Sequence, residues 1–314
     1  MSNRKIGIVG AGAVGATAAY TLAMMGTCEE IVLYDINQEI AIGKAIDIEQ
    51  STIYANKITK ITGATNASDL QDCSIVVVTA GVPRKEGMTR EDLLMINAKI
   101  IKDVVQNIER YSPNAKIICV ANPLDVMTYV IHKLTSWDRN RIIGMAGALD
   151  SSRMAYQINQ KLNYGSTDIK AMVIGDHGEN MIPCTEFSNV GGISLDMLVS
   201  KEDMEDIIQR TKNGGAQIVK HLGTSAYYAP ARAIAVMVEA ILDDNNIIVP
   251  SSVLLQNEYG HNDVTVGVPV VLGKNGIEKV IELEMNEELQ NKFNDSVDSI
   301  KSGINILEEN NFFV

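Results

Sequence analysis

The first half of the chain alternates short apolar runs with longer segments of helical periodicity. The run KIGIVG at 5–10 is short, rich in branched residues and closed by a glycine, which is typical of a buried strand. The alanine-rich segment AVGATAAYTLAMMG that follows it has the length and terminal glycine of a helix. The alternation continues through strand-like segments at 30–35, 60–65, 74–81 and 115–123 and helix-like segments near 38–50 and 90–111.

This alternation predicts a parallel sheet. Strands that are apolar on both faces and separated by helices indicate a sheet that helices cover on both sides. Because βαβ crossovers are right-handed, such a unit becomes a doubly wound α/β sheet of the Rossmann type.

The pattern changes near Gly144, where we predict a domain boundary between 1–144 and 145–314. The second part is expected to be an α+β domain that carries substrate-binding and catalytic residues. Its predicted elements are a helix beginning near 149–160, a strand running into a loop at 169–180, a helical stretch at 201–243, an antiparallel hairpin at 264–283 turning at Asn275-Gly276, and an amphipathic C-terminal helix at 288–307.

Charge and composition narrow the class of partner and compartment. The net charge is −12, so the surface repels nucleic acid and anionic lipid, and neither is expected as a partner. We find no run of 18 apolar residues and no secretory signal, so neither a membrane span nor secretion is expected. The four cysteines are widely spaced and show no metal-binding pattern, which favours reduced thiols, a cytoplasmic protein and no metal site.

A glycine loop joins the first strand to the first helix. Gly10 permits a tight turn, Gly12 allows a pyrophosphate to approach the backbone, and Gly15 allows close helix–strand packing. Asp35 ends the second strand, where a carboxylate accepts hydrogen bonds from ribose hydroxyls and repels a 2′-phosphate. This predicts NAD rather than NADP, with an unliganded turn and a strand-end Asp35 as the alternative.

Four polar residues between 122 and 177 are candidates for catalytic or substrate-binding roles. His177 lies in a glycine-bordered loop, and Asp150 and Arg153 are spaced to share one helical face. Asn122 follows an apolar strand, at the edge where parallel sheets bind ligands. Taken singly, each has an ordinary structural alternative: a hydrogen-bonded histidine, an ion pair or N-cap, and a turn residue.

Two arginines stand six positions apart in GVPRKEGMTRED. Arg90 follows Thr89, which can cap a helix together with Asp92 in a capping box. Arg90 is then either a solvated residue of the first helical turn or a side chain that binds an anion. Arg84 is either a solvated loop residue or a second anion-binding side chain.

Together these segments resemble the lactate/malate dehydrogenase family along essentially the whole chain. The resemblance rests on the glycine loop, TAGVPRKEGMTREDLL, VANPLDVMT, GALDSSR and GDHGENMIP. Within the family, the segments are most similar to the malate dehydrogenases of lactate-dehydrogenase-like type. This implies reversible hydride transfer between (S)-malate and NAD+, as in the tricarboxylic acid cycle, by a homo-oligomer that is a tetramer rather than a dimer.

The resemblance also implies a role for each matching position. His177 is expected to accept the substrate proton, with Asp150 orienting it, and Arg153 to bind the C1 carboxylate. Arg90 would polarise the reacting oxygen, and Arg84 would pair with the C4 carboxylate, because lactate dehydrogenases carry glutamine there. The expected cofactor residues are Gly10, Ala11, Gly12, Ala13, Val14, Gly15, Asp35, Asn97, Val120 and Asn122, the last of which would also contact the substrate.

These roles agree with elementary chemistry. A histidine, whose reference pKa is about 6.5, suits proton transfer near neutral pH, and arginine grips a carboxylate with two parallel hydrogen bonds. The nearest alternative is an L-lactate or other 2-hydroxyacid dehydrogenase. Such enzymes share the catalytic residues, and only Arg84 distinguishes a malate dehydrogenase from them. An NAD-dependent glycosidase needs a cysteine–histidine metal site and a longer chain, and a noncatalytic NAD-binding module does not need His177, Asp150, Arg90 and Arg153 together.

Overall fold

A computed structural model describes residues 4–55, 58–83 and 87–314. Its first half is a six-stranded parallel sheet with the order β3-β2-β1-β4-β5-β6. This confirms the predicted doubly wound arrangement. The strands are β1 (Lys5–Val9), β2 (Glu30–Tyr34), β3 (Lys60–Gly63), β4 (Ile75–Val78), β5 (Lys116–Cys119) and β6 (Ile142–Gly144).

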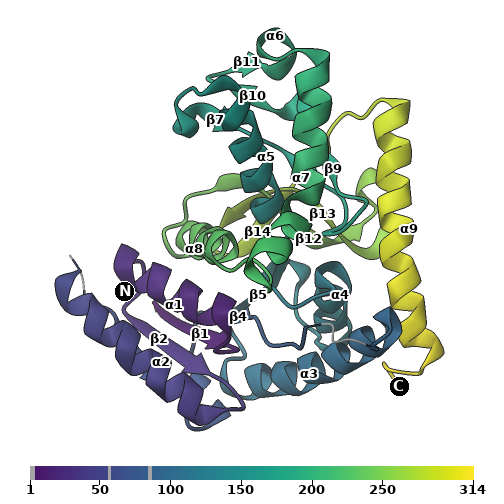
Figure 1. Cartoon of the computed structure of the whole chain (residues 1–314). Helices are drawn as coiled ribbons and strands as arrows, with labels where there is room; N and C mark the ends of the chain where they lie inside the picture. Colours follow the sequence, from purple (N-terminus) through teal and green to yellow (C-terminus); the bar gives the residue numbers. More distant parts are fainter. Residues whose placement is uncertain (1–3, 56–57, 84–86) are drawn as a thin grey trace.

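Helices connect these strands and cover both faces of the sheet (Figure 1). The chain order reverses between β1 and β4, so right-handed crossovers place the first two helices on one face and the next two on the other. The helices are α1 (Ala13–Met25), α2 (Gln38–Ser51), α3 (Arg90–Tyr111) and α4 (Leu124–Leu134). The capping box predicted for the third of them is confirmed, since Thr89 Oγ1 accepts the Asp92 N–H and Asp92 Oδ2 accepts the Thr89 N–H, both at 3.0 Å.

The second half continues the same sheet. Ser252 of β12 (Ile247–Gln256) pairs antiparallel with Gly144 at the end of β6, and β13 (Asn262–Gly273) and β14 (Gly276–Val280) follow, giving nine strands. The predicted hairpin is confirmed, but its two turn residues are Lys274 and Asn275, one position before the predicted Asn275-Gly276 pair. Gly276 already belongs to β14 and pairs with Gly273. Strand β12 is not foreseen by the sequence pattern, because Pro250 and the buried pair Ser251 and Ser252 interrupt its apolar run.

The first three of the remaining helices and a small sheet form an outer lobe above this sheet, whereas the fourth helix packs against α1 and the fifth runs along one side of the molecule (Figure 1). The helices are α5 (Gly147–Leu162), α6 (Leu195–Leu198), α7 (Lys201–Leu222), α8 (Tyr228–Leu242) and α9 (Glu287–Glu309). One small sheet has the order β11-β10-β7, from Ile193–Ser194, Asn189–Val190 and Ile169–Lys170, and another pairs β8 (Val173–Ile174) with β9 (Ile182–Pro183). Short 3₁₀ helices span Thr52–Tyr54, Ala67–Leu70, Arg139–Arg141, Ser166–Asp168, Thr185–Phe187 and Glu258–Gly260.

Two predicted elements of the second half are wrong in detail. The helical stretch predicted at 201–243 is two helices, because Gly223 takes a left-handed conformation, with φ 69°, and caps α7. The strand predicted at the start of 169–180 is two dipeptide strands, β7 and β8, which belong to different sheets. The amphipathic C-terminal helix is confirmed as α9, which runs along one side of the molecule to the start of α3 (Figure 1).

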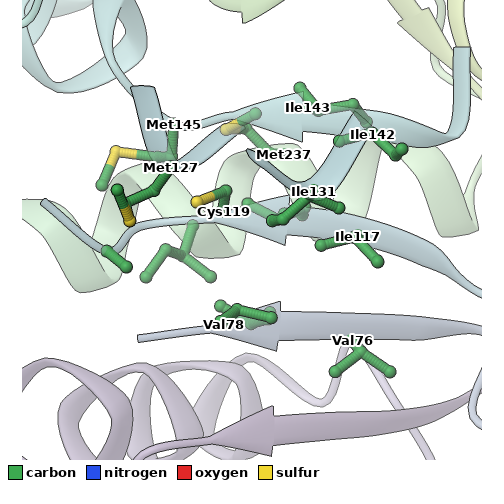
Figure 2. Close-up of a cluster of buried hydrophobic side chains, with 14 of the residues drawn as sticks. Val76, Val78, Ile117, Cys119, Met127, Ile131, Ile142, Ile143, Met145 and Met237 are labelled. Atoms are coloured by element: carbon green, nitrogen blue, oxygen red, sulfur yellow. The ribbon is translucent and has the colours of Figure 1, made fainter. Parts of the chain in front are cut away.

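One continuous apolar core holds both halves together. All four residues of β4 are buried, and Figure 2 shows Val76 and Val78 of this strand near Ile117 and Cys119 of β5, with Met127 and Ile131 of α4 alongside. Burial of such a side chain contributes about 1.5–3 kcal/mol. A second cluster fills the outer lobe and includes Met154, Ile158, Val173, Met181, Leu195 and Ile207.

This core fixes the carboxyl edge of the parallel strands. The glycine loop leaves β1 there, Asn122 follows β5, and α5 begins three residues after β6. Ligands of doubly wound sheets bind at this edge. Within the described ranges, no helix is long and apolar enough to cross a membrane.

Buried His132 on α4 makes the fold sensitive to acid. Burial lowers the pKa of His132 to about 4, from a reference of 6.5. The unfolded chain therefore takes up a proton below pH 6.5 that the folded chain takes up only near pH 4, and stability is lost as pH falls through that window. Between pH 7 and pH 4, the free energy of unfolding should fall by about 3 kcal/mol more in the wild type than in the His132→Asn variant. Urea unfolding at both pH values measures this, and equal losses in the two proteins would contradict it.

Candidate active site

A single buried carboxylate connects two of the predicted functional side chains. Asp150 lies in the first turn of α5 and is 1% exposed. Its Oδ2 is 2.7 Å from His177 Nδ1, and its Oδ1 accepts a hydrogen bond of 2.9 Å from Arg153 Nη1. Asp150 and Arg153 therefore share one face of α5, as predicted from their i, i+3 spacing. His177, from another part of the chain, binds the same carboxylate.

His177 projects from the loop that follows β8. Gly175, two residues before it, exchanges two backbone hydrogen bonds of 2.8 and 3.0 Å with Gly267 of β13, which fixes the start of the loop. With Nδ1 on a carboxylate, the neutral ring carries its proton on Nδ1 and keeps Nε2 free as the basic atom. Burial lowers the pKa of His177, but the charge and hydrogen bond of Asp150, with help from Asp125, outweigh burial and raise it above the usual value.

A cavity of about 390 Å³ collects several of the predicted residues. It opens at the carboxyl edge of the sheet, between the start of α1, α5 and α7. The predicted residues that line it are Val14, Val120, Asn122, Arg153 and His177. Asp150 lies behind this wall, so the cavity presents one imidazole and one guanidinium that share a buried anion.

The glycine loop beside this cavity fits a dinucleotide. A Cβ on Gly12 would meet no atom within 4 Å, whereas one on Gly15 would lie 1.9 Å from the Gly10 carbonyl oxygen. Gly10 has φ 104°, a conformation that favours glycine. Gly12 caps α1 without a side-chain hydrogen bond, so the helix N-terminus is left open toward a phosphate.

Asp35 has a contact that was not predicted. Its Oδ2 accepts the Ala11 N–H at 2.6 Å and its Oδ1 accepts the Asn37 N–H at 2.9 Å, while Lys44 Nζ donates to the Ala11 carbonyl at 2.6 Å. Asp35 thus holds the glycine loop. A carboxylate has about four acceptor positions, so both oxygens retain capacity for ribose hydroxyls.

Asn97 lies behind this cavity, and Arg90 lines a neighbouring cavity of about 420 Å³ that Asn122 and His177 also line. The Asn97 side chain is buried, donates to the Asn122 carbonyl at 2.7 Å and accepts the Val82 N–H at 2.9 Å, so it ties two loops of the site together from behind. Arg90 points outward and pairs with Glu179 at 3.3 Å, both side chains being well exposed. Arg84 lies outside the described residues.

Sequence reasoning missed the α7 side of the cavity. Lys212, Gly215 and Val219 of α7 and Ser225 and Ala226 beyond it line the wall opposite the sheet. The available signal was the pair Gly214-Gly215 inside a helical pattern, which costs helix stability and usually has a packing reason. Here a Cβ at 215 would lie 3.6 Å from Arg153 Nη2, an ordinary contact distance, so Gly215 packs directly beside the guanidinium.

Arg153 retains hydrogen-bonding capacity toward the cavity. Its Nε has no hydrogen-bond partner among the described residues, although it is buried. A bound carboxylate would satisfy such a donor. The described ranges hold no group of three or more His, Cys, Asp or Glu side chains arranged to bind a metal ion.

Comparisons with known proteins agree with this geometry. The family model described as "lactate/malate dehydrogenase, NAD binding domain" matches residues 4–144, and that described as "lactate/malate dehydrogenase, alpha/beta C-terminal domain" matches residues 147–311. The malate dehydrogenase of Sulfurimonas denitrificans is 52% identical over 311 residues, which are 99% of this chain and 98% of the relative.

Solved structures show the same fold over nearly the whole length. The malate dehydrogenase of Salinibacter ruber superposes with a TM-score of 0.93 at 38% identity, over 97% of this chain and 98% of that one. A lactate dehydrogenase of Cryptosporidium parvum, solved with lactic acid and NAD, also reaches 0.93, at 34% identity over 98% and 99% of the two chains.

The open position of Gly12 gives a test of the cofactor loop. We expect Gly12→Ala to leave the melting temperature within a few degrees of the wild type, because φ is −66° and the Cβ meets no protein atom. The methyl group would occupy the approach of the pyrophosphate and raise the Kd for NADH about tenfold or more, which is ~1.4 kcal/mol. Gly43→Ala on α2, where a Cβ also meets nothing, is the matched control and should leave the Kd unchanged. Fluorescence titration with NADH measures both variants, and equal Kd values would contradict the assignment.

Proposed function

The chain belongs to the lactate/malate dehydrogenase family, and on that premise we propose that it catalyses NAD-dependent, reversible oxidation of (S)-malate to oxaloacetate. The observation that carries the chemistry is the Asp150 carboxylate shared between His177 and Arg153 at the wall of a cavity. It places a proton acceptor and an anion ligand side by side, as oxidation of a 2-hydroxy acid requires.

The proposed steps assign one task to each side chain. Arg153 binds the C1 carboxylate of malate through two hydrogen bonds, which brings the C2 hydroxyl toward His177. His177 Nε2 takes the hydroxyl proton while hydride leaves C2, and the Asp150 charge stabilises the imidazolium that forms. Bound NAD+ supplies the hydride acceptor. In the reverse direction protonated His177 donates to the ketone oxygen of oxaloacetate.

Arg90 is proposed to stabilise the charge that develops on the reacting oxygen. In the described structure its partner is Glu179, on the loop that carries His177. Exposed ion pairs are worth only about 0–1 kcal/mol, so Glu179 is a partner that Arg90 readily exchanges for substrate. Arg84 is proposed to bind the C4 carboxylate, on the strength of the sequence alone.

The cofactor site is proposed to run from the cavity to Asp35. Gly10, Ala11, Gly12, Ala13, Val14 and Gly15 form the pyrophosphate loop, Val120 and Asn122 line the nicotinamide end, and Asn97 acts by holding Asn122 in place. The carboxylate of Asp35 favours NAD over NADP because a 2′-phosphate would face its charge.

An L-lactate or other 2-hydroxyacid dehydrogenase is the alternative, and it is not favoured. The lactate dehydrogenase from Cryptosporidium parvum shares the fold at 34% identity, whereas the malate dehydrogenase from Sulfurimonas denitrificans reaches 52%. A noncatalytic module is disfavoured by the arrangement of His177, Asp150 and Arg153.

Assembly and location complete the proposal. Large apolar side chains are exposed on and just after α1 and α2, including Tyr20, Ile46, Ile53 and Tyr54, which supports a face covered by a second copy of the chain. We favour a tetramer over a dimer, and a division into domains at Gly144. The four cysteines are buried and unpaired, which is compatible with a reducing cytoplasm.

Substrate choice provides the first test of the function. We expect NADH oxidation with oxaloacetate to exceed that with pyruvate in kcat/KM, and NADPH to be a poor substitute for NADH. Arg84→Gln should reduce the preference for oxaloacetate about 10²-fold or more, because the second carboxylate loses its partner, whereas Arg84→Lys keeps the charge and part of the preference. An Arg84→Gln enzyme that retains the wild-type ratio would contradict the diacid assignment.

Asp150 provides the second test. Asp150→Asn removes the charge that raises the His177 pKa, so the pH above which oxaloacetate reduction declines should move to lower values. We also expect kcat to fall about 10²-fold or more, because the imidazolium loses its counterion. Steady-state rates from pH 5 to 9 measure both effects, and a variant with the wild-type pH profile would show that Asp150 does not act on His177.

A further inference from the structure

Asp125 is a buried carboxylate that the proposed chemistry leaves without a role. It lies in the first turn of α4 and is 5% exposed. The loop that carries His177 packs next to it. Its Oδ2 accepts the backbone N–H of His177 at 2.8 Å. Its own carbonyl oxygen accepts a hydrogen bond of 2.6 Å from Thr265 Oγ1 of β13. Asp125 therefore joins α4, β13 and the His177 peptide.

A buried carboxylate at this position carries an unfavourable desolvation energy. Asp125 Oδ1 has no hydrogen-bond partner among the described residues, and neither has the nearby buried hydroxyl of Ser252. Burial raises the pKa of Asp125 above its usual value, and the His177 N–H and the charge of His177 offset this only in part. An asparagine would accept the same backbone hydrogen bond without the desolvation of a charge. The backbone hydrogen bond alone therefore does not account for a carboxylate at this position.

We propose that Asp125 is a second positioning residue for His177, which holds the peptide group of the histidine while Asp150 holds its imidazole ring. The inference rests on the proposed role of His177 in proton transfer. The two carboxylates approach His177 from different elements, Asp150 from α5 and Asp125 from α4. Together they fix both the backbone and the ring, which leaves the imidazole little freedom to leave the geometry needed for proton transfer.

The charges around His177 define what Asp125 adds. The groups that face it are Asp125 from α4, Asp150 and Arg153 from α5, Asp176 and Glu179 from its own loop, Arg90 from α3 and Lys212 from α7, while α9 contributes the hydroxyls of Ser296 and Ser299. Arg153 is already paired with Asp150 and Arg90 with Glu179. Among the described residues Asp125 forms no ion pair with a lysine or arginine, so its charge, when it is ionised, acts on the imidazole of His177.

The charge of Asp125 also acts on the neighbouring Asp176. Burial and the charge of Asp125 raise the pKa of Asp176 to about 6. By the same field, Asp125 favours the protonated imidazole. Loss of the Asp125 charge therefore moves the His177 titration to lower pH in both directions of the reaction.

Three substitutions separate the hydrogen bond from the charge. Asp125→Asn keeps an acceptor for the His177 N–H and removes the charge, whereas Asp125→Ala removes both. Asp263→Asn is the matched control, because Asp263 is a carboxylate at the start of β13 that contacts α4 through Lys133 and Tyr129 and does not face His177. The measurement is kcat and kcat/KM for oxaloacetate and NADH from pH 5 to 9, with the Kd for NADH as a check on the cofactor site.

We expect Asp125→Asn to shift the decline of oxaloacetate reduction to lower pH and to keep kcat at low pH within about tenfold of the wild type. Asp125→Ala should lose about 10²-fold further in kcat, with the Kd for NADH unchanged, because the ring is no longer placed correctly. Asp263→Asn should match the wild type. The proposal is overturned if Asp125→Asn has the wild-type pH profile, or if Asp125→Ala retains the kcat of Asp125→Asn.

The hydrogen bond between Asp125 and the His177 amide can also be tested by hydrogen exchange, and the role of His177 by its own substitution. If the Asp125 variants do not fold, ¹⁵N-histidine labelling of the unmodified enzyme gives four amide signals, of which His177→Asn identifies one. That amide should be protected from hydrogen exchange, and exchange at the rate of an exposed loop would overturn the proposal. His177→Asn also separates the two claims: an active His177→Asn enzyme contradicts the proposed function, whereas its inactivity alongside wild-type behaviour of the Asp125 variants contradicts only this inference.

Discussion

The Asp150 carboxylate is the constraint on which the site depends. It is withdrawn from water, and each of its oxygens is occupied, one by the imidazole of His177 and the other by the guanidinium of Arg153. A buried charge is stable only when it is paired and hydrogen-bonded in this way. Because both partners bind the same small group, the proton acceptor and the carboxylate ligand are held at a fixed separation. Neither can move without leaving a buried charge unpaired.

The sheet provides the frame for that carboxylate. β12 pairs with β6 beside the last residue of the parallel half, so the two halves of the chain share one sheet rather than meet at a flexible linker. Helix α5 starts directly after this junction, where a Cβ on Gly147 would lie 2.4 Å from the Cβ of Pro250. This close packing sets Asp150 relative to Asn122 and the glycine loop, and hence relative to a bound cofactor.

The sequence pattern predicted what depends on neighbours along the chain. The glycine loop, the Thr89–Asp92 capping box and the hairpin each involve a few adjacent residues and can be predicted from spacing, although the turn of the hairpin lies one residue before the predicted Asn275-Gly276 pair. The contact between Asp150 and His177 spans 27 residues and required either the fold or the resemblance to a family. Spacing alone left both residues with ordinary structural alternatives.

Other features were not predictable for identifiable reasons. The α7 wall of the cavity is formed by a helix whose register against Arg153 is set by tertiary packing, and only its glycine pair gave a local signal. Asp125 reads as an ordinary first-turn acidic residue of α4, because its partner, the His177 N–H, lies 52 residues away. The ion pair between Arg90 and Glu179 joins residues that are 89 positions apart in the sequence.

The most direct measurement of the central claim is a crystal structure of the protein with NADH and a dicarboxylate analogue of oxaloacetate that cannot be reduced. We predict that Asp150 keeps both contacts, that His177 Nε2 lies within hydrogen-bonding distance of the 2-position oxygen of the ligand, and that Arg153 binds its C1 carboxylate. A ligand held by other cations, with Arg153 paired to Asp150 alone and His177 turned away from the nicotinamide ring, would contradict it.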